Sequence, residues 1–240
     1  MTALRQSVVA PDVQITFDMA GRGTLNDAIV EKARQNHYAL IIKAPSQRAR
    51  GRSDPDDWQL IRRCPVPLLL TTGRPWHPTA RFLAAIDVVN PQDLEQRRAV
   101  IEAANALKLA CAAELDLVQI ESPNSRDPAR CELGTRSQLE KVGEVYDLAT
   151  SRLHQLTGRT SELLGQFVAK RQYDLLIVGV SSGTRALWTP SIGFSLAQSL
   201  SSADCDLLMI QDSDGVQPVL SGRRALRWSA FPFWQWLGTD

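Results

Sequence analysis

Residues 174–179 read DLLIVG, four consecutive large apolar residues between an aspartate and a glycine. A continuous apolar run of this kind is typical of a strand that is buried on both faces of a parallel sheet. The preceding segment, Ser161–Lys170, carries apolar side chains at helical spacing. A helix that leads into a buried strand ending in glycine predicts part of a βαβ unit.

The same alternation of helical and strand patterns extends in both directions along the chain. Further strands are predicted at Val13–Phe17, Ala39–Lys43, Pro67–Thr71, Phe82–Asp87, Leu115–Glu121 and Asp206–Gln211. Further helices are predicted at Leu25–Gln35, Asp57–Arg62, Leu94–Glu114 and Ser137–Leu156, with a loop at Asn124–Gly134. The run ALIIK at Ala39–Lys43 is expected to be covered on both faces. The pattern predicts an α/β fold with a parallel sheet.

An internal repeat relates the two halves of the chain. Asn36–Lys43 (NHYALIIK) resembles Arg171–Val178 (RQYDLLIV), where a tyrosine enters a short buried strand in each case. Downstream, Arg63–Thr71 (RCPVPLLLT) resembles Asp204–Gln211 (DCDLLMIQ), where a cysteine enters the last strand. Both matches occur in the same order at an offset of about 140 residues, the length of one domain.

These strands together resemble the universal stress protein family. The residues that carry the likeness are FLAAID at Phe82–Asp87, DLLIVG with the glycine-containing loop after it, and CDLLMIQ at Cys205–Gln211. Tandem bacterial members are especially similar, because Asp57–Leu70 carries the pattern DW-x-L-x-R-x-CPVPLLL. The resemblance covers residues 13–212. It implies an open five-stranded parallel sheet in each domain with helices on both faces, the adenine-nucleotide alpha-hydrolase-like fold.

Compared with that family, the chain holds one and a half repeats. Residues 1–72 match the C-terminal half of a first domain, 73–81 form a linker, 82–212 a second domain, and 213–240 a C-terminal tail. The first two strands and helices of the first repeat are absent, so Met1 is expected to be a wrongly assigned start. The alternative is that the remnant leans on the second domain or on another chain. The third strand of the second domain is expected to be missing or vestigial, because the helical pattern Ser137–Leu156 leaves no room for it.

A ligand site is predicted where the strand order of the sheet reverses. In open α/β sheets, ligands bind beyond the carboxyl ends of the strands at such a point. If Phe82–Asp87 neighbours the strand Asp174–Gly179, the reversal falls between them, and Asp87 and Gly179 end adjacent strands. The resemblance implies that Asp87 matches an aspartate which contacts the nucleotide in relatives.

The loop after Gly179 partly matches the phosphate loop of ATP-binding relatives, G-x-x-G, nine residues, then G followed by Ser or Thr. Gly183 and Gly193 keep the nine-residue spacing, but the spacing from Gly179 to Gly183 is one residue too long. Phe194 stands at the Ser or Thr position, and Ser195 follows it. The resemblance implies ATP with Mg²⁺ as the candidate cofactor. Two interpretations stay open: a loop that holds phosphate through its amides, or a structural turn.

Composition limits the classes of function. A net charge of +1 gives no electrostatic basis for binding nucleic acid. The four cysteines have no metal or disulfide spacing, which indicates reduced thiols in a cytoplasmic protein. No apolar run approaches the ~20 residues of a transmembrane segment, and no secretory signal opens the sequence.

The function expected from these features is stress-response regulation by ligand or partner binding rather than catalysis, since no nucleophile–base pair is evident. One alternative is an ATP-binding switch with weak ATPase activity that uses the glycine loop. The other is an assembly scaffold that uses the last strands and the aromatic tail Arg223–Leu237. An adenine nucleotide or other small ligand and self-association are the expected partners. In simpler relatives association runs through the last strand, so Pro67–Thr71 and Asp206–Gln211 are candidates to pair within one chain.

Overall fold

The computed structural model describes residues 24–36, 38–44, 57–88, 94–121, 128–158, 160–180 and 205–211. The predicted strand Val13–Phe17 and the tail 213–240 lie outside these residues. Within them, helices and strands alternate as the sequence predicts, and none of the described helices is both long and apolar enough to cross a bilayer.

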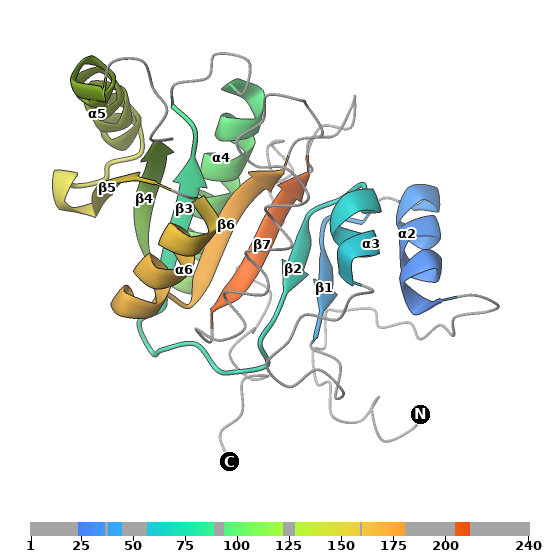
Figure 1. The fold of residues 1–240 in the computed structure, drawn as a ribbon. Helices are drawn as coiled ribbons and strands as arrows, with labels where there is room; N and C mark the ends of the chain where they lie inside the picture. The colour runs from blue at the N-terminus through green and yellow to red at the C-terminus, as the bar shows by residue number, and fades with distance from the viewer. Residues whose placement is uncertain are drawn as a thin grey trace.

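A seven-stranded sheet forms the centre of the molecule, in the order β1-β2-β7-β6-β3-β4-β5 (Figure 1). All neighbouring strands are parallel except β2 and β7, which are antiparallel. The α/β class is therefore confirmed, and the strands from β7 to β5 form the expected five-stranded parallel unit. The strands are β1 (Ile41–Lys43), β2 (Leu68–Leu70), β3 (Arg81–Ile86), β4 (Glu114–Glu121), β5 (Leu153–Thr157), β6 (Leu175–Val180) and β7 (Asp206–Gln211).

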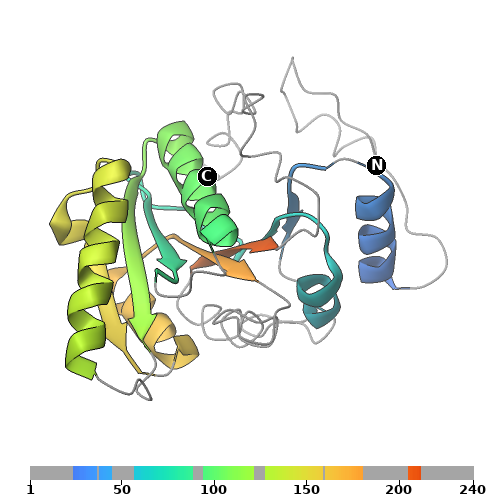
Figure 2. The same ribbon diagram turned by 90° about the horizontal axis from the view of Figure 1, so that it is seen from above.

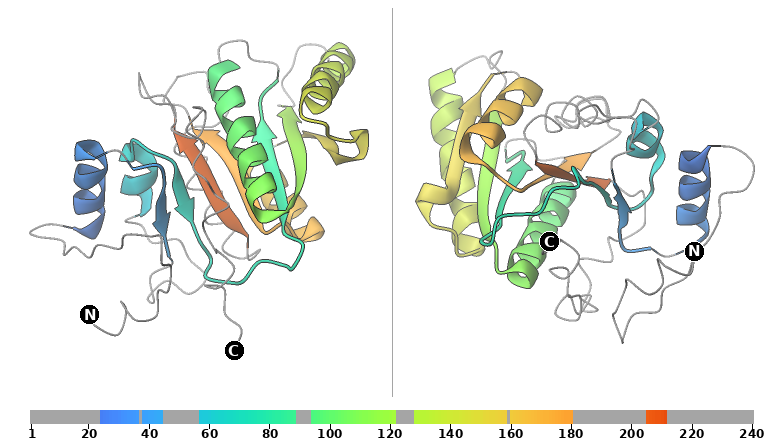
Figure 3. Two further views of the ribbon diagram at one scale, coloured as in Figure 1. Left: turned by 180° about the vertical axis from the view of Figure 1, so that it is seen from behind. Right: turned by 90° about the horizontal axis from the view of Figure 1, so that it is seen from below.

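Helices cover both faces of the sheet (Figures 2 and 3). Buried side chains of α2 (Leu25–Gln35), α3 (Asp57–Arg63) and α6 (Thr160–Arg171) belong to one apolar core. Those of α4 (Leu94–Cys111) and α5 (Pro128–Val145) belong to a second core on the opposite face. Strands that are buried from both sides need apolar residues at consecutive positions, which explains the uninterrupted apolar runs.

The antiparallel junction of β2 and β7 joins the two halves of the chain into one sheet. Its register pairs Leu68 with Met209, Leu69 with Leu208, and Leu70 with Leu207. Leu69 and Leu208 belong to one core, whereas Leu68 and Met209 belong to the other. The predicted pairing of the two last strands within one chain is therefore confirmed, and both cores continue across the junction.

The connection between β2 and β3 is fixed to the amino-terminal edge of the sheet. The backbone N–H of Thr72 donates to Oδ1 of Asp206 at 2.7 Å, and the indole Nε1 of Trp76 donates to Oδ2 at 2.9 Å. The backbone N–H groups of His77 and Arg81 donate to the carboxylate of Asp174 at 3.0 and 2.8 Å. Buried acceptors thus hold a segment that has no regular structure of its own.

Several local predictions are wrong. The predicted loop Asn124–Gly134 is helical from Pro128 onward, because α5 begins there. The predicted helix Ser137–Leu156 ends at Val145, and a 3₁₀ turn, η2 (Thr150–Arg152), follows before the strand β5. The third strand of the second unit is consequently present, as β5 pairs in parallel with β4 along five residue pairs.

The expectation that the strand at Ala39–Lys43 is covered on both faces is wrong. The strand β1 is not covered on both faces, since Ile42 is 52% exposed. This edge strand pairs only with β2 among the described residues.

Of the cysteines, Cys64 and Cys205 are buried free thiols and Cys111 is a half-buried one. Burial raises the pKa of all three thiols.

Candidate functional site

The strand order of the sheet reverses at β3. The chain leaves β3 through α4 to reach β4 on one side, and later passes from β5 through α6 to β6 on the other side of β3. Because α4 and α6 lie on opposite faces, the carboxyl ends of β3 and β6 border the crevice in which open α/β sheets bind ligands.

Asp87 and Gly179 lie at the carboxyl ends of adjacent strands. Asp87 directly follows β3, and Gly179 is the next-to-last residue of β6. The parallel register of Ala85 with Val178 brings the ends of the two strands side by side. The structure therefore brings these two predicted site residues together. Gly183, Gly193 and Ser195 lie outside the described residues, and their role in nucleotide binding stays a prediction.

Two side chains fix the backbone around Asp87. Nη1 of Arg97 donates to the carbonyl oxygen of Asp87 at 3.2 Å. Oε1 of Gln119 accepts a hydrogen bond from the backbone N–H of Val88 at 2.7 Å. The other end of the Gln119 amide donates to the carbonyl of Ile120 at 2.9 Å, so this buried side chain is satisfied at both ends. The position of the half-buried Asp87 is thus set from both α4 and β4.

Gly179 has a packing role that does not depend on any phosphate. A Cβ atom at this position would lie 2.7 Å from Cγ of Gln96, closer than real side chains approach. Gln96 lies over the ends of β6 and β7, and its Nε2 donates to the carbonyl of Ile210 at 3.1 Å. The glycine therefore lets the first turn of α4 approach the sheet.

Sequence reasoning did not identify Gln96, Arg97 and Gln119. The first two are the third and fourth residues of α4, the helix that starts at the carboxyl edge of the sheet. In a βαβ unit the first turn of this helix faces the crevice, so their position in the sequence is itself a signal. Gln119 interrupts an apolar strand, which marks a buried amide that requires partners.

A second polar cluster lies at the opposite, amino-terminal edge of the sheet, around the buried carboxylate of Asp116. Its Oδ2 accepts hydrogen bonds from the hydroxyl of Tyr173 at 2.6 Å and from Nε2 of His154 at 2.9 Å. Its Oδ1 accepts one from Nη1 of Arg152 at 2.9 Å. Burial by itself raises the pKa of Asp116, but these three donors together outweigh it and lower that pKa. Burial and the neighbouring Asp116 raise the pKa of Tyr173, which remains a donor.

None of the clusters of His, Cys, Asp and Glu in the described part of the chain has the three members needed to hold a metal ion. At the carboxyl ends of β3 and β6 the described residues include the carboxylate of Asp87 and the guanidinium of Arg97, which also holds the Asp87 carbonyl. Such groups recognise a ligand by charge and hydrogen bonds.

No protein-family model matches the chain. It is 22% identical over 222 residues to a universal stress protein E homolog of Haemophilus influenzae, covering 85% of this chain and 72% of that protein. The structure of a functionally unknown protein from Pseudomonas aeruginosa PAO1 aligns with a TM-score of 0.70 at 23% identity, over 89% of this chain and 77% of that one. A universal stress protein from Archaeoglobus fulgidus aligns with a TM-score of 0.53 at 15% identity, over 79% and 67%. The structural likenesses show the fold, and the names of the relatives support the universal stress protein family.

Proposed function

We propose that this chain is a stress-response regulatory protein of the universal stress type that acts in the cytoplasm by binding a ligand or partner rather than by catalysis. The observation that carries this proposal is the pairing of β3 with β6, which brings Asp87 and Gly179 to the same edge of the sheet, with a backbone fixed by Arg97 and Gln119. A fixed backbone beside a carboxylate is suited to recognition, because little ordering remains to be done when a ligand arrives.

An adenine nucleotide with Mg²⁺ is the proposed ligand to test first. The spacing of Gly183 and Gly193 favours a loop that surrounds phosphate, and the family resemblance implies that Asp87 matches an aspartate which contacts the nucleotide in relatives. In this second candidate function the chain is an ATP-binding switch with weak ATPase activity. The close packing of Gln96 explains why position 179 is a glycine without any bound phosphate. Support for a phosphate-binding loop therefore comes only from the glycines that follow it.

The junction of β2 and β7 bears on the scaffold alternative. Both last strands already pair with each other inside the chain, so their paired edges are not open to another copy. Self-association would therefore use a different surface, and the aromatic segment Arg223–Leu237 remains the candidate for it.

Calorimetric titration of ATP with Mg²⁺ into the purified chain tests the nucleotide proposal, together with mass analysis of molecules that co-purify. Binding that is lost in Gly193→Val and weakened in Asp87→Asn supports the switch. The control is Gly134→Ala, at a helical glycine with open space around it. Absence of binding assigns the function to another ligand or a partner. Rapid turnover of a substrate that Asp87→Ala abolishes would overturn the non-catalytic proposal.

A further inference from the structure

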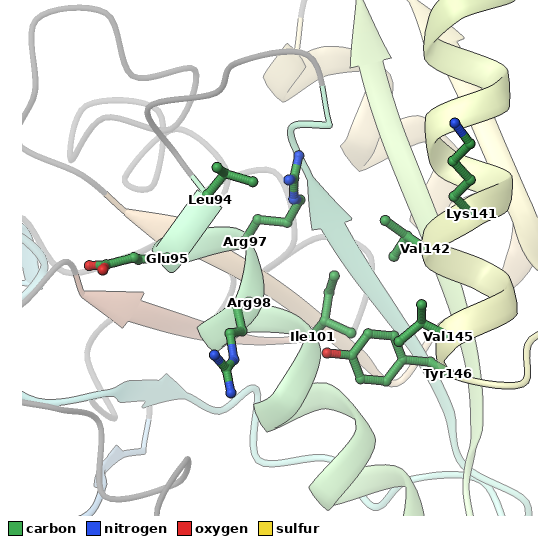
Figure 4. Close-up of a pocket in the computed structure, with 9 residues that line it drawn as sticks. All are labelled: Leu94, Glu95, Arg97, Arg98, Ile101, Lys141, Val142, Val145 and Tyr146. Atoms are coloured by element: carbon green, nitrogen blue, oxygen red, sulfur yellow. The ribbon is translucent and has the colours of Figure 1, made fainter.

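A groove of about 480 Å³ lies between the first turns of α4 and the end of α5 (Figure 4). It lies on the face of the sheet that α4 and α5 cover. The described residues that line it come from both helices: Leu94, Glu95, Arg97, Arg98, Ile101, Lys141, Val142, Val145 and Tyr146. A volume in this range suits a small ligand rather than a macromolecule.

The lower part of the groove is lined mainly by apolar side chains. Ile101 is buried, while Val142 and Tyr146 are partly buried and pack against the same core. Val145 is 76% exposed, although its side chain is aliphatic. Burial, and then the charge of Glu102, raise the pKa of Tyr146, so its hydroxyl keeps its proton and remains a hydrogen-bond donor. Covering these surfaces with an apolar body would remove them from water.

The upper part of the groove is cationic. Figure 4 shows Arg97 and Lys141 on opposite walls, with the apolar side chains between and below them. Lys141 forms no ion pair with any described residue, whereas Arg98 is paired with Glu102 at 2.6 Å. Glu95 is the acidic lining residue, so the cations are in excess at the groove. An anionic group is therefore the charge complement of this end.

We propose that this groove binds a small amphipathic carboxylate, with its carboxylate between Arg97 and Lys141 and its aliphatic chain along Ile101, Val142 and Tyr146. Two observations select this class over a nucleotide or a sugar. The lower groove is lined mainly with apolar side chains and a single phenol, and the cation beside them, Arg98, is paired with Glu102, whereas Arg97 and Lys141 lie at the upper end. A medium-chain fatty carboxylate has the same division into an anionic head and an apolar body.

The groove shares one residue with the carboxyl ends of the strands, Arg97. Arg97 lines the groove, and its Nη1 also holds the carbonyl of Asp87. A carboxylate bound at Arg97 would therefore pair with the same guanidinium that holds the carbonyl of Asp87. The proposal does not require that the crevice bind a nucleotide.

Titration of octanoate into the full chain, followed by calorimetry and by amide shifts in NMR spectra, tests this inference. The expected result is saturable binding with shifts at α4 and α5, and much weaker binding of octylamine, which has the same chain and the opposite charge. Val145→Glu places a like charge at an exposed position that folding tolerates, and it should weaken octanoate binding several-fold. Lys141→Gln should weaken it as well.

Matched controls separate the groove from the general surface. Leu109→Glu introduces the same charge on α4 at a residue that is 71% exposed and does not line the groove. Lys170→Gln removes a lysine from α6 on the opposite face. Both variants should bind octanoate as the parent chain does. Absence of saturable octanoate binding, equal affinity for octylamine, or unchanged affinity in both Val145→Glu and Lys141→Gln would overturn the proposal.

Discussion

Asp116 and Asp206 are both buried at the amino-terminal edge of the sheet, yet their pKa values shift in opposite directions. Burial is the largest influence on each and raises both pKa values. Around Asp116 the donors include the charged guanidinium of Arg152, and together they reverse the effect of burial. Around Asp206 the donors are neutral groups such as the indole of Trp76, and the nearby charge of Asp174 adds to the upward shift.

The first prediction concerns Asp116→Asn. A carboxyl group whose pKa is lowered by folding stabilises the protein above its unfolded pKa of about 3.9, and this contribution is lost as the pH falls through the folded value. At pH 7 the variant should lose about 1–3 kcal/mol, because an amide cannot accept the hydrogen bonds of Tyr173, His154 and Arg152 together. Urea unfolding from pH 7 down to pH 3 should show the difference from the parent chain shrinking as the pH falls. Asp147→Asn, at an exposed position, should show no such trend.

The second prediction has the opposite sign and concerns Asp206→Asn. A carboxyl group whose pKa is raised by folding contributes its stability below the unfolded pKa, and loses it as the pH rises through the folded value. The variant cannot ionise, so its stability should fall less than that of the parent chain as the pH rises from about 4. Its amide cannot accept from both Thr72 and Trp76, which costs about 1 kcal/mol at every pH. Parallel unfolding curves across the pH range would contradict this.

The third prediction tests why position 179 is a glycine. Gly179→Ala forces its new methyl group against Gln96 and should destabilise the chain by about 1–3 kcal/mol. In the background of Gln96→Ala the same change should cost much less, although Gln96→Ala itself loses the hydrogen bond to Ile210. A double-mutant cycle measured by urea unfolding gives the coupling between the two positions. Strictly additive effects would show that Gln96 is not the reason for the glycine.

The fourth prediction concerns the support of the crevice by Gln119. Gln119→Leu keeps the approximate size of the side chain but leaves the N–H of Val88 without its acceptor, at a cost of about 1–3 kcal/mol. Hydrogen exchange of the Val88 amide should become faster, because its closed state is less favoured. Gln138→Leu, at an exposed position on α5, is the control and should leave this amide unchanged. Unaltered exchange in Gln119→Leu would mean that other contacts hold this loop.

The sequence predicted most buried strands because their apolar runs are continuous. The segment Asp206–Gln211 matches β7 at both ends, and Leu25–Gln35 matches α2, whose start is marked by the side chain of Thr24 accepting from the N–H of Asp27. The strand β5 was not predicted, since its short sequence LHQLT has only two apolar positions and continues the helical spacing before it. Shortly after the helix ends, Asp147 has a φ of 52°, which no helical residue adopts. The spacing of apolar residues in a single sequence does not reveal this change of backbone conformation.

The candidate site was predictable only in part, for a related reason. Asp87 and Gly179 end strands, and strand ends can be located in a sequence. Gln96 and Gln119 act through contacts with residues that are distant in the chain, as in the pairing of Gln96 with Ile210. Such contacts depend on strand order and register, which a single sequence does not contain. The helix α5 was placed too late because Gly134 suggested a loop, whereas Pro128 at its first position was the informative residue.

The antiparallel junction of β2 and β7 has a consequence for how this molecule can change over time. In a symmetric dimer, any substitution at a two-fold interface appears twice, once on each side. Here Leu69 and Leu208 face each other but are encoded separately, so each side of the junction can vary alone. The half of the sheet that holds β1 and β2 can therefore lose ligand-binding residues of its own. It still packs against β7 and so continues to stabilise the other half.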